Sequence, residues 1–200
     1  MTGAYLLDLD GVLVDSVAAA TRSWKWWASL RGVPPWPFIG AHGRPSRETI
    51  AELAPQLDAE AEAELVEERE ISDTEGVVAL PGAEAMLRQS QPIAIVTSGA
   101  TRLAEARLRA AGLPRPEVLV SADSVSRGKP DPEPYLLAAQ RLGVAPSRCT
   151  VFEDAPAGVT AGHAAGMRVV ALTTTVSADE LDGADRIVAN LAEYLHEEPR

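Results

Sequence analysis

The second half of the chain alternates short apolar segments with helix-forming segments, and this alternation limits the possible fold more than any other feature. Strands that alternate with helices form a parallel sheet covered by helices on both faces. The predicted helices are residues 81–88, 102–111, 133–142 and 157–165. The predicted strands are residues 4–7, 93–96, 118–120, 150–152, 168–172 and 186–188. The sequence therefore predicts a Rossmann-like α/β core, and the first strand, although distant in sequence, belongs to it.

The segment between the first strand and this alternating half has a different pattern. Residues 17–31 and 58–72 have helical patterns, and no part of the segment alternates like a strand. We therefore expect a small α-helical cap, residues 16–80, inserted into an α/β core formed by residues 1–15 and 81–200.

The charge of the chain excludes several classes of partner. Eighteen Lys and Arg residues against 29 Asp and Glu residues give a net charge of −11. The densest acidic run, Glu60 to Glu70, is predicted to form a solvent-exposed helix face. A protein this acidic is poorly suited to bind nucleic acid or an anionic membrane, and no apolar run approaches the length of a transmembrane helix. We expect a cytoplasmic monomer that acts on a small molecule, with its single cysteine, Cys149, in a buried strand.

Four carboxylates follow two of the predicted strands. Asp8 and Asp10 come after the first strand, and Glu153 and Asp154 come after strand 150–152. The carboxyl ends of parallel strands are where open α/β sheets place their chemistry. Carboxylates that lie close together repel one another, and a cation relieves the repulsion, so the four acids predict an oxygen-rich Mg²⁺ site. Taken singly, each pair also fits ordinary turn residues.

Hydroxyl groups and a lysine follow other segments of the core. Thr97, Ser98 and Gly99 end one strand and open a helix, where hydroxyls and free N–H groups suit a phosphate oxygen or a simple N-cap. Lys129, one of only two lysines, lies between Gly128 and Pro130 and by itself fits a surface turn. Together with the carboxylates, these groups supply what phosphoryl transfer requires: a nucleophile, an acid/base, a cation and donors for the phosphoryl oxygens.

These segments resemble, in the same order, the four motifs of the haloacid dehalogenase superfamily. The motifs are Asp8-x-Asp10-Gly, Thr97-Ser98-Gly99, Gly128-Lys129-Pro130 and Glu153-Asp154. An aspartate at position 10 is similar to the phosphatase and phosphomutase branches. The helical insertion resembles the cap of the β-phosphoglucomutase-like subfamily.

The resemblance implies a role for each of these residues. It implies that Asp8 is the nucleophile and becomes an aspartyl-phosphate, and that Asp10 is the general acid/base. It implies that Mg²⁺ is held by Asp8, the backbone carbonyl of Asp10 and Asp154, with Glu153 either a direct ligand or a residue behind the ligands. The residues implied to hold the phosphoryl oxygens are Thr97, Ser98 and Lys129.

The cap loop is where the resemblance points to a substrate. The segment around His42, Gly43 and Arg44 resembles the cap loop of sugar and polyol phosphate phosphatases. We therefore expect these three residues to contact a small phosphorylated metabolite.

Two other functions remain open. A sugar phosphomutase is the first, although β-phosphoglucomutase has a histidine where this chain has Ala18-Ala19-Ala20, and its Ser-Arg pair follows the glycine at a shorter spacing than Ser46-Arg47 does here. The second is a non-catalytic phospho-acceptor module of the receiver type, which would lack both the cap and an aspartate equivalent to Asp10. These differences favour hydrolysis.

Overall fold

A six-stranded parallel sheet forms the centre of the molecule. The computed structural model describes residues 3–34 and 45–197. The strands occur in the order β5-β4-β1-β6-β7-β8, so the chain crosses from one half of the sheet to the other in the connection between β5 and β6. Their bounds are β1 Ala4–Leu7, β4 Ile93–Val96, β5 Val118–Val120, β6 Cys149–Glu153, β7 Arg168–Leu172 and β8 Arg186–Val188. The predicted Rossmann-like fold is confirmed.

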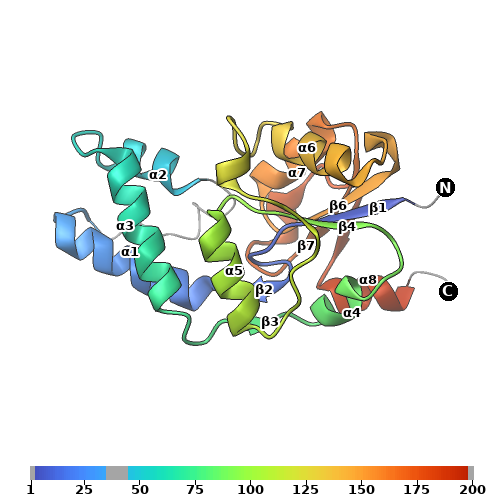
Figure 1. Ribbon diagram of the computed structural model, residues 1–200, viewed down its shortest axis with the longest axis horizontal. Coiled ribbons are helices and arrows are strands. Elements are labelled where there is room, and N and C mark those ends of the chain that lie inside the picture. The colour runs from blue at the N-terminus through green and yellow to red at the C-terminus, as the bar shows by residue number, and fades with distance from the viewer. Residues whose placement is uncertain (1–2, 35–44, 198–200) are drawn as a thin grey trace.

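Helices cover both faces of the sheet (Figure 1). Successive strand residues point to opposite faces, so Leu6 joins one buried cluster and Leu7 joins the other. The cluster of Leu6 includes residues of α6 (Glu133–Leu142) and α7 (Pro156–Ala164). The cluster of Leu7 includes residues of the other three core helices. These are α4 Ala83–Leu87, α5 Thr101–Ala110 and α8 Leu191–Glu197. Three short 3-10 helices complete the core: Ala122–Ser124, Pro146–Arg148 and Ala178–Leu181.

Three helices pack together at the end of the molecule away from the chain termini (Figure 1). They are α1 Val17–Arg31, α2 Ser46–Leu53 and α3 Ala59–Ser72. Trp27, Ile50 and Val66, one from each helix, are fully buried in a hydrophobic cluster of their own. Trp24, one turn before Trp27 on α1, belongs to the same cluster.

A short antiparallel pair of strands, which the sequence did not predict, lies where the chain enters and leaves this helical segment. Val14 pairs with Ala79, and Asp15 pairs with Val78. These pairs form β2 (Val14–Asp15) and β3 (Val78–Ala79). The pairing brings the two ends of the segment together beside β1.

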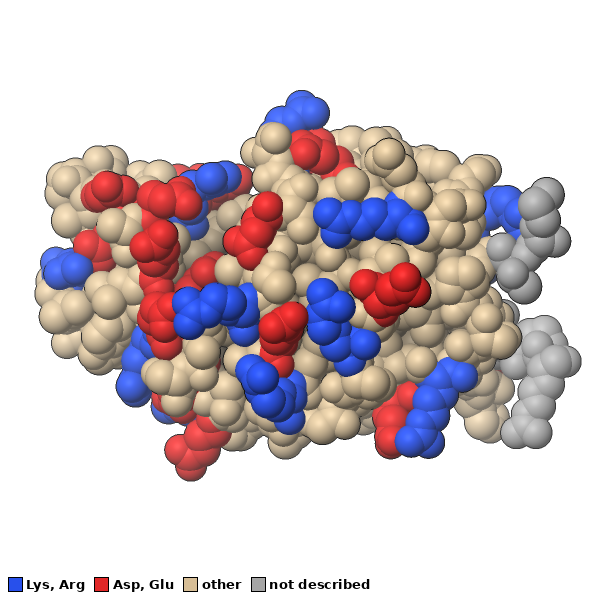
Figure 2. Space-filling view, in the orientation of Figure 1, with Lys and Arg blue, Asp and Glu red and all other residues tan. Residues whose placement is uncertain are grey.

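The acidic face predicted for α3 is only partly exposed. Figure 2 shows acidic side chains gathered over the end of the molecule that carries α1–α3, interspersed with basic ones. Glu62 and Glu70 are nevertheless buried. Glu62 accepts hydrogen bonds from Trp27 Nε1 at 2.7 Å and Arg31 Nε at 2.8 Å. The prediction of a solvent-exposed face was therefore wrong for these two carboxylates, whose partners lie on other helices.

Candidate active site

The register of β1 and β6 places two carboxylates beside each other. Leu7 pairs with Phe152, and the N–H of Asp8 donates to the carbonyl of Phe152 at 3.0 Å. Asp8 and Glu153 therefore emerge together at the carboxyl ends of neighbouring parallel strands. Both side chains are buried, which is costly for charged groups unless a partner of opposite charge is present.

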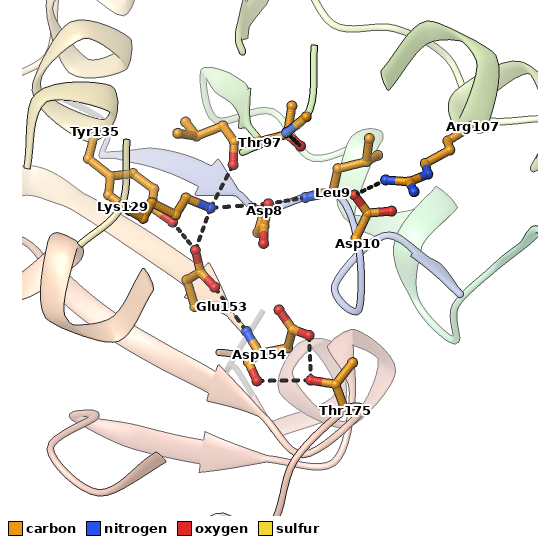
Figure 3. Close-up of polar contacts among 12 residues, drawn as sticks. Asp8, Leu9, Asp10, Thr97, Arg107, Lys129, Tyr135, Glu153, Asp154 and Thr175 are labelled. Atoms are coloured by element: carbon orange, nitrogen blue, oxygen red, sulfur yellow. Dashed lines mark hydrogen bonds and ion pairs between the residues drawn. The ribbon is translucent and has the colours of Figure 1, made fainter. Parts of the chain in front are cut away.

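Lys129 is that partner (Figure 3). Its Nζ lies 3.1 Å from Asp8 Oδ1 and 2.6 Å from Glu153 Oε1, and it donates to the carbonyl of Val96 at 3.0 Å. Its side chain is only 1% exposed. Lys129 thus lies beside two of the four predicted carboxylates, and the alternative of a surface lysine in a turn is excluded.

The buried charges shift one another's pKa values. Burial raises the pKa of Asp8 to about 7, because the attraction of Lys129 only partly offsets the loss of water and the repulsion from Glu153 and Asp10. Burial by itself would lower the pKa of Lys129, but attraction to Asp8 and Glu153 outweighs it and raises that pKa. The site therefore holds more negative charge than its lysine can balance.

Asp154 adds a third carboxylate to this group. Asp8, Glu153 and Asp154 each offer an oxygen within 4.8 Å of the others. Burial, together with the repulsion from Asp8 and Glu153, raises the pKa of Asp154 well above its usual value. Gly11 leaves room for this group, since a Cβ there would lie 1.9 Å from Asp154 Oδ2. A buried set of carboxylate oxygens with excess negative charge fits a hard divalent cation such as Mg²⁺.

Glu153 differs from the other two carboxylates in its contacts. Its Oε1 meets Lys129 and accepts a hydrogen bond from Tyr135, and its Oε2 accepts from the N–H of Asp154 at 3.2 Å. A Cβ on Gly158 would collide with its carboxylate at 1.9 Å, so glycine is required at that position. Both oxygens of Glu153 are thus already engaged by the protein.

Asp10 points to a different set of partners. Ser16 Oγ donates to its Oδ1 at 2.6 Å, and Arg107 Nη1 donates to its Oδ2 at 2.6 Å. The Asp10 side chain is 24% exposed, whereas that of Asp8 is 6% exposed. Asp10 therefore remains within reach of solvent and of a ligand, while Asp8 is enclosed. The predicted metal contact of Asp10, through its backbone carbonyl, stays a prediction.

The buried carboxyl of Glu70, on α3, lies 3.3 Å from Arg107 and makes the stability of the fold depend on pH. Burial raises its pKa from 4.5 to about 7, although Arg107 opposes the rise. Such a carboxyl binds its proton more tightly in the folded protein than in the unfolded chain. We therefore expect the free energy of unfolding to fall as the pH rises from about 4.5 to about 7, and to fall less in Glu70→Gln. Urea unfolding across this pH range measures both slopes. The exposed Glu64→Gln is the control, and equal slopes in the wild type and Glu70→Gln would contradict the assignment.

The remaining predicted residues lie at the edge of the site or outside the described part of the chain. Thr97 is buried at the end of β4, and its Oγ1 accepts from the N–H of Gly99 at 3.2 Å. Ser98 lines a neighbouring cavity of about 220 Å³ between the helical segment and the core. The charged residues that line this cavity are Arg47, Glu60, Glu64, Glu67 and Asp123. The predicted substrate contacts His42, Gly43 and Arg44 lie outside the described residues.

Comparison with known proteins identifies the family of this chain. The family model for haloacid dehalogenase-like hydrolases matches residues 2–166. The chain belongs to this family. The prediction made from its four motifs is confirmed.

The relatives of this haloacid dehalogenase-like hydrolase include named phosphatases. It is 44% identical to hexitol phosphatase A of Escherichia coli, over 94% of this chain and 90% of that protein. It is 39% identical to validoxylamine A 7′-phosphate phosphatase of Streptomyces hygroscopicus subsp. limoneus, over 94% and 93% of the two chains. A hydrolase from Pseudomonas syringae has the same fold, with a TM-score of 0.86, 28% identity and coverage of 98% and 97%. These relatives support the predicted phosphoric monoester hydrolase activity. Among residues 3–34 and 45–197, no helix combines the length and apolar composition needed to cross a membrane.

The structure of this hydrolase adds residues that the sequence motifs did not indicate. Tyr135 donates to Glu153, and Thr175 donates to both the side chain and the backbone carbonyl of Asp154. Arg107 contacts Asp10 from the last turn of α5. Only Arg107 left a signal in the sequence, because it lies one turn after the apolar Leu103 on the same helix face, where an arginine is unexpected.

Proposed function

We propose that this protein is a Mg²⁺-dependent phosphatase that hydrolyses a small sugar or polyol phosphate through an aspartyl-phosphate intermediate. The observation that carries the proposal is the buried contact of Lys129 with both Asp8 and Glu153, beside Asp154. A lysine fixed against a carboxylate in this way can hold a phosphoryl oxygen while the carboxylate attacks phosphorus.

In the proposed first step, an oxygen of Asp8 forms a bond to phosphorus as the bond between phosphorus and the alcohol oxygen breaks. Asp10, protonated at this point, gives its proton to the departing oxygen, so that the product leaves as a neutral alcohol. The greater exposure of Asp10 supports this division of roles, because an acid must reach the leaving group whereas the nucleophile needs only to reach phosphorus.

In the proposed second step, the Asp10 carboxylate takes a proton from a water molecule whose oxygen attacks phosphorus. The bond between Asp8 and phosphorus breaks, inorganic phosphate is released, and Asp10 is again protonated. Thr97, the backbone at Ser98 and Lys129 hold the phosphoryl oxygens through both steps, with Lys129 also offsetting the negative charge of the protein at the site.

The proposed Mg²⁺ would be held by Asp8, Asp154 and the backbone carbonyl of Asp10. When bound, it would neutralise charge on the phosphoryl group and on the clustered carboxylates. We place Glu153 behind the ligands, because both of its oxygens already contact Lys129, Tyr135 or the backbone. There it orients Lys129 and supports the ligand set, as residues behind a metal site commonly do.

The proposed substrate class follows from the cavity beside Ser98. Four carboxylates and one arginine line it, so an anionic group on the alcohol side of the substrate would be repelled. Carboxylates accept hydrogen bonds from hydroxyl groups, which favours a neutral, hydroxyl-rich alcohol such as a sugar or polyol. We propose that residues 16–80 form the cap that covers this alcohol and that His42, Gly43 and Arg44 contribute to it.

We expect magnesium-dependent phosphate release from at least one sugar or polyol phosphate. The experiment incubates the protein with a panel of such esters and p-nitrophenyl phosphate, with Mg²⁺ or with EDTA, and measures inorganic phosphate. Removal of Mg²⁺ should abolish turnover, and its return should restore it, since the carboxylate cluster then lacks its counter-charge. Absence of release from every ester would contradict the proposed function. Conversion of a hexose 1-phosphate to the 6-phosphate without free phosphate would favour a phosphomutase instead.

A further inference from the structure

Three charged side chains from separate parts of the chain lie in contact at the edge of the site, two of them buried and the third, Asp10, partly exposed. Arg107, on α5, is 8% exposed in its side chain. Its Nη1 lies 2.6 Å from Asp10 Oδ2, in the loop after β1, and its Nη2 lies 3.3 Å from Glu70 Oε1, on α3. In Figure 3, Arg107 approaches Asp10 from the side opposite Asp8.

We infer that Arg107 is a positioning residue for Asp10 and that Glu70 of α3 holds Arg107 in place. The inference rests on the function proposed above, because it concerns the side chain proposed as the general acid/base. It adds a residue outside the four motifs and links that side chain to the helical segment.

Stability alone does not account for an arginine at this position. Leu103, one turn earlier on the same helix face, is a buried apolar residue, so this face does not itself require an arginine at position 107. A buried ion pair is often no more stabilising than well-packed apolar side chains of similar volume, because both ions lose their water. The presence of Arg107 is therefore better explained by its contact with Asp10 than by a contribution to the stability of the core.

Arg107 fixes the direction of the Asp10 carboxylate. Ser16 binds one oxygen of that carboxylate and Arg107 binds the other, so the short side chain has little freedom to rotate. Proton transfer requires the acid and the accepting oxygen to lie within hydrogen-bond distance in the right direction. Without Arg107, the Ser16 hydroxyl alone would hold Asp10, and fewer molecules would present its proton to the leaving group.

Glu70 contacts the other terminal nitrogen of Arg107, Nη2. Its Oε1 can accept a hydrogen bond from the guanidinium whether the carboxyl is ionised or neutral. A glutamine keeps an oxygen acceptor at this place, whereas a methionine of similar size does not. These two substitutions therefore separate the loss of the contact from the loss of the charge.

A second ion pair between the same two helices provides a control. Arg102 of α5 contacts Glu68 of α3, and both side chains of this pair are exposed to solvent. An Arg102→Met variant removes a comparable link between α3 and α5 and should leave catalysis unchanged. It therefore tests whether any arginine that joins the two helices has the effect expected for Arg107.

The experiment compares two esters that differ in their need for a proton. A polyol phosphate that the wild-type protein hydrolyses needs an acid to protonate its leaving alcohol, whereas p-nitrophenol departs readily without protonation. We expect Arg107→Met to lower kcat/KM for the polyol phosphate by more than about tenfold and for p-nitrophenyl phosphate by less than about threefold. The larger loss is a part of the roughly 10²–10⁴-fold rate enhancement that general acid catalysis supplies. The ratio of the two values does not depend on how much of the variant is folded. Arg107→Lys and Glu70→Met should give smaller changes in this ratio, and Glu70→Gln should preserve it.

Each other outcome overturns the inference in a recognisable way. Equal losses on both esters would make Arg107 a purely structural residue, and an unchanged ratio with full activity would give it no role. A rise in kcat/KM for the polyol phosphate would show that Arg107 restrains Asp10 rather than positions it. A wild-type protein that hydrolyses neither ester would contradict the proposed function instead, so the two failures are distinguishable.

Discussion

Replacing Asp8 with asparagine should lower phosphate release by roughly four orders of magnitude or more, the scale seen when an enzyme loses its nucleophile. An amide cannot form the bond to phosphorus that the proposed first step requires. The substitution keeps the local structure, because the amide oxygen can still accept the hydrogen bond that Asp8 Oδ1 receives from the N–H of Leu9 at 2.7 Å. The measurement is steady-state phosphate release, with mass spectrometry of quenched wild-type enzyme to detect one added phosphoryl group on the peptide that contains Asp8.

The same variant should be at least as stable as the wild type in the absence of divalent cations. Burial holds the pKa of Asp8 at about 7, so at higher pH its charged form opposes folding, and asparagine removes that charge. Mg²⁺ should raise the Tm of the wild type more than that of Asp8→Asn, because the variant has one fewer carboxylate to hold the ion. This second readout does not depend on activity.

Asp15→Asn is a suitable control for Asp8→Asn. Asp15 is exposed a few residues further along, and its Oδ1 accepts from the N–H of Val17 at 3.2 Å, a contact that asparagine can keep. Asp15→Asn should retain wild-type turnover. Substantial turnover by Asp8→Asn, or a phosphoryl group on another residue, would show that Asp8 is not the nucleophile.

The sequence predicted the core of the molecule because local pattern determines it. Each strand is a short apolar run, and parallel strands bring their carboxyl ends to one edge, so Asp8 and Glu153 could be expected to meet. Lys129 could be placed near them only through the motif, because nothing in its own neighbourhood shows that it is buried. The two-residue strands β2 and β3 were missed because they are too short to show any alternation.

The acidic run on α3 shows where local pattern fails. A helix with this many glutamates indicates a solvent-exposed surface, yet Glu62 and Glu70 face inward. Their partners, Arg31 and Arg107, come from helices more than 30 residues away in the sequence. Whether a carboxylate is buried depends on such distant partners, so the contact of α3 with Arg107 could not be predicted from sequence spacing.

Replacing Lys129 with methionine should impair both stability and catalysis. The side chain would still fill its place, but Asp8 and Glu153 would lose the ammonium group that lies within 3.1 Å of the first and 2.6 Å of the second. Removing one partner of a buried ion pair costs about 3–5 kcal/mol, because the remaining charge stays out of water. We expect urea unfolding to show a loss of this order, and kcat/KM to fall by roughly 10²–10³ from the loss of one electrostatic contact to the phosphoryl group.

The loss of stability in Lys129→Met should increase with pH. The pKa of Asp8 is already raised by burial, and without Lys129 this carboxyl binds its proton still more tightly in the folded protein than in the unfolded chain, so the folded state is disfavoured as the pH rises. Adding Glu153→Gln to Lys129→Met removes one of the uncompensated charges and should recover part of the stability without recovering activity. Lys25→Met, which alters the only other lysine, an exposed residue of α1, should change neither quantity. If Lys129→Met unfolded like the wild type at all pH values, the ammonium would not be balancing the two carboxylates, and its role in holding phosphate would lose its physical basis.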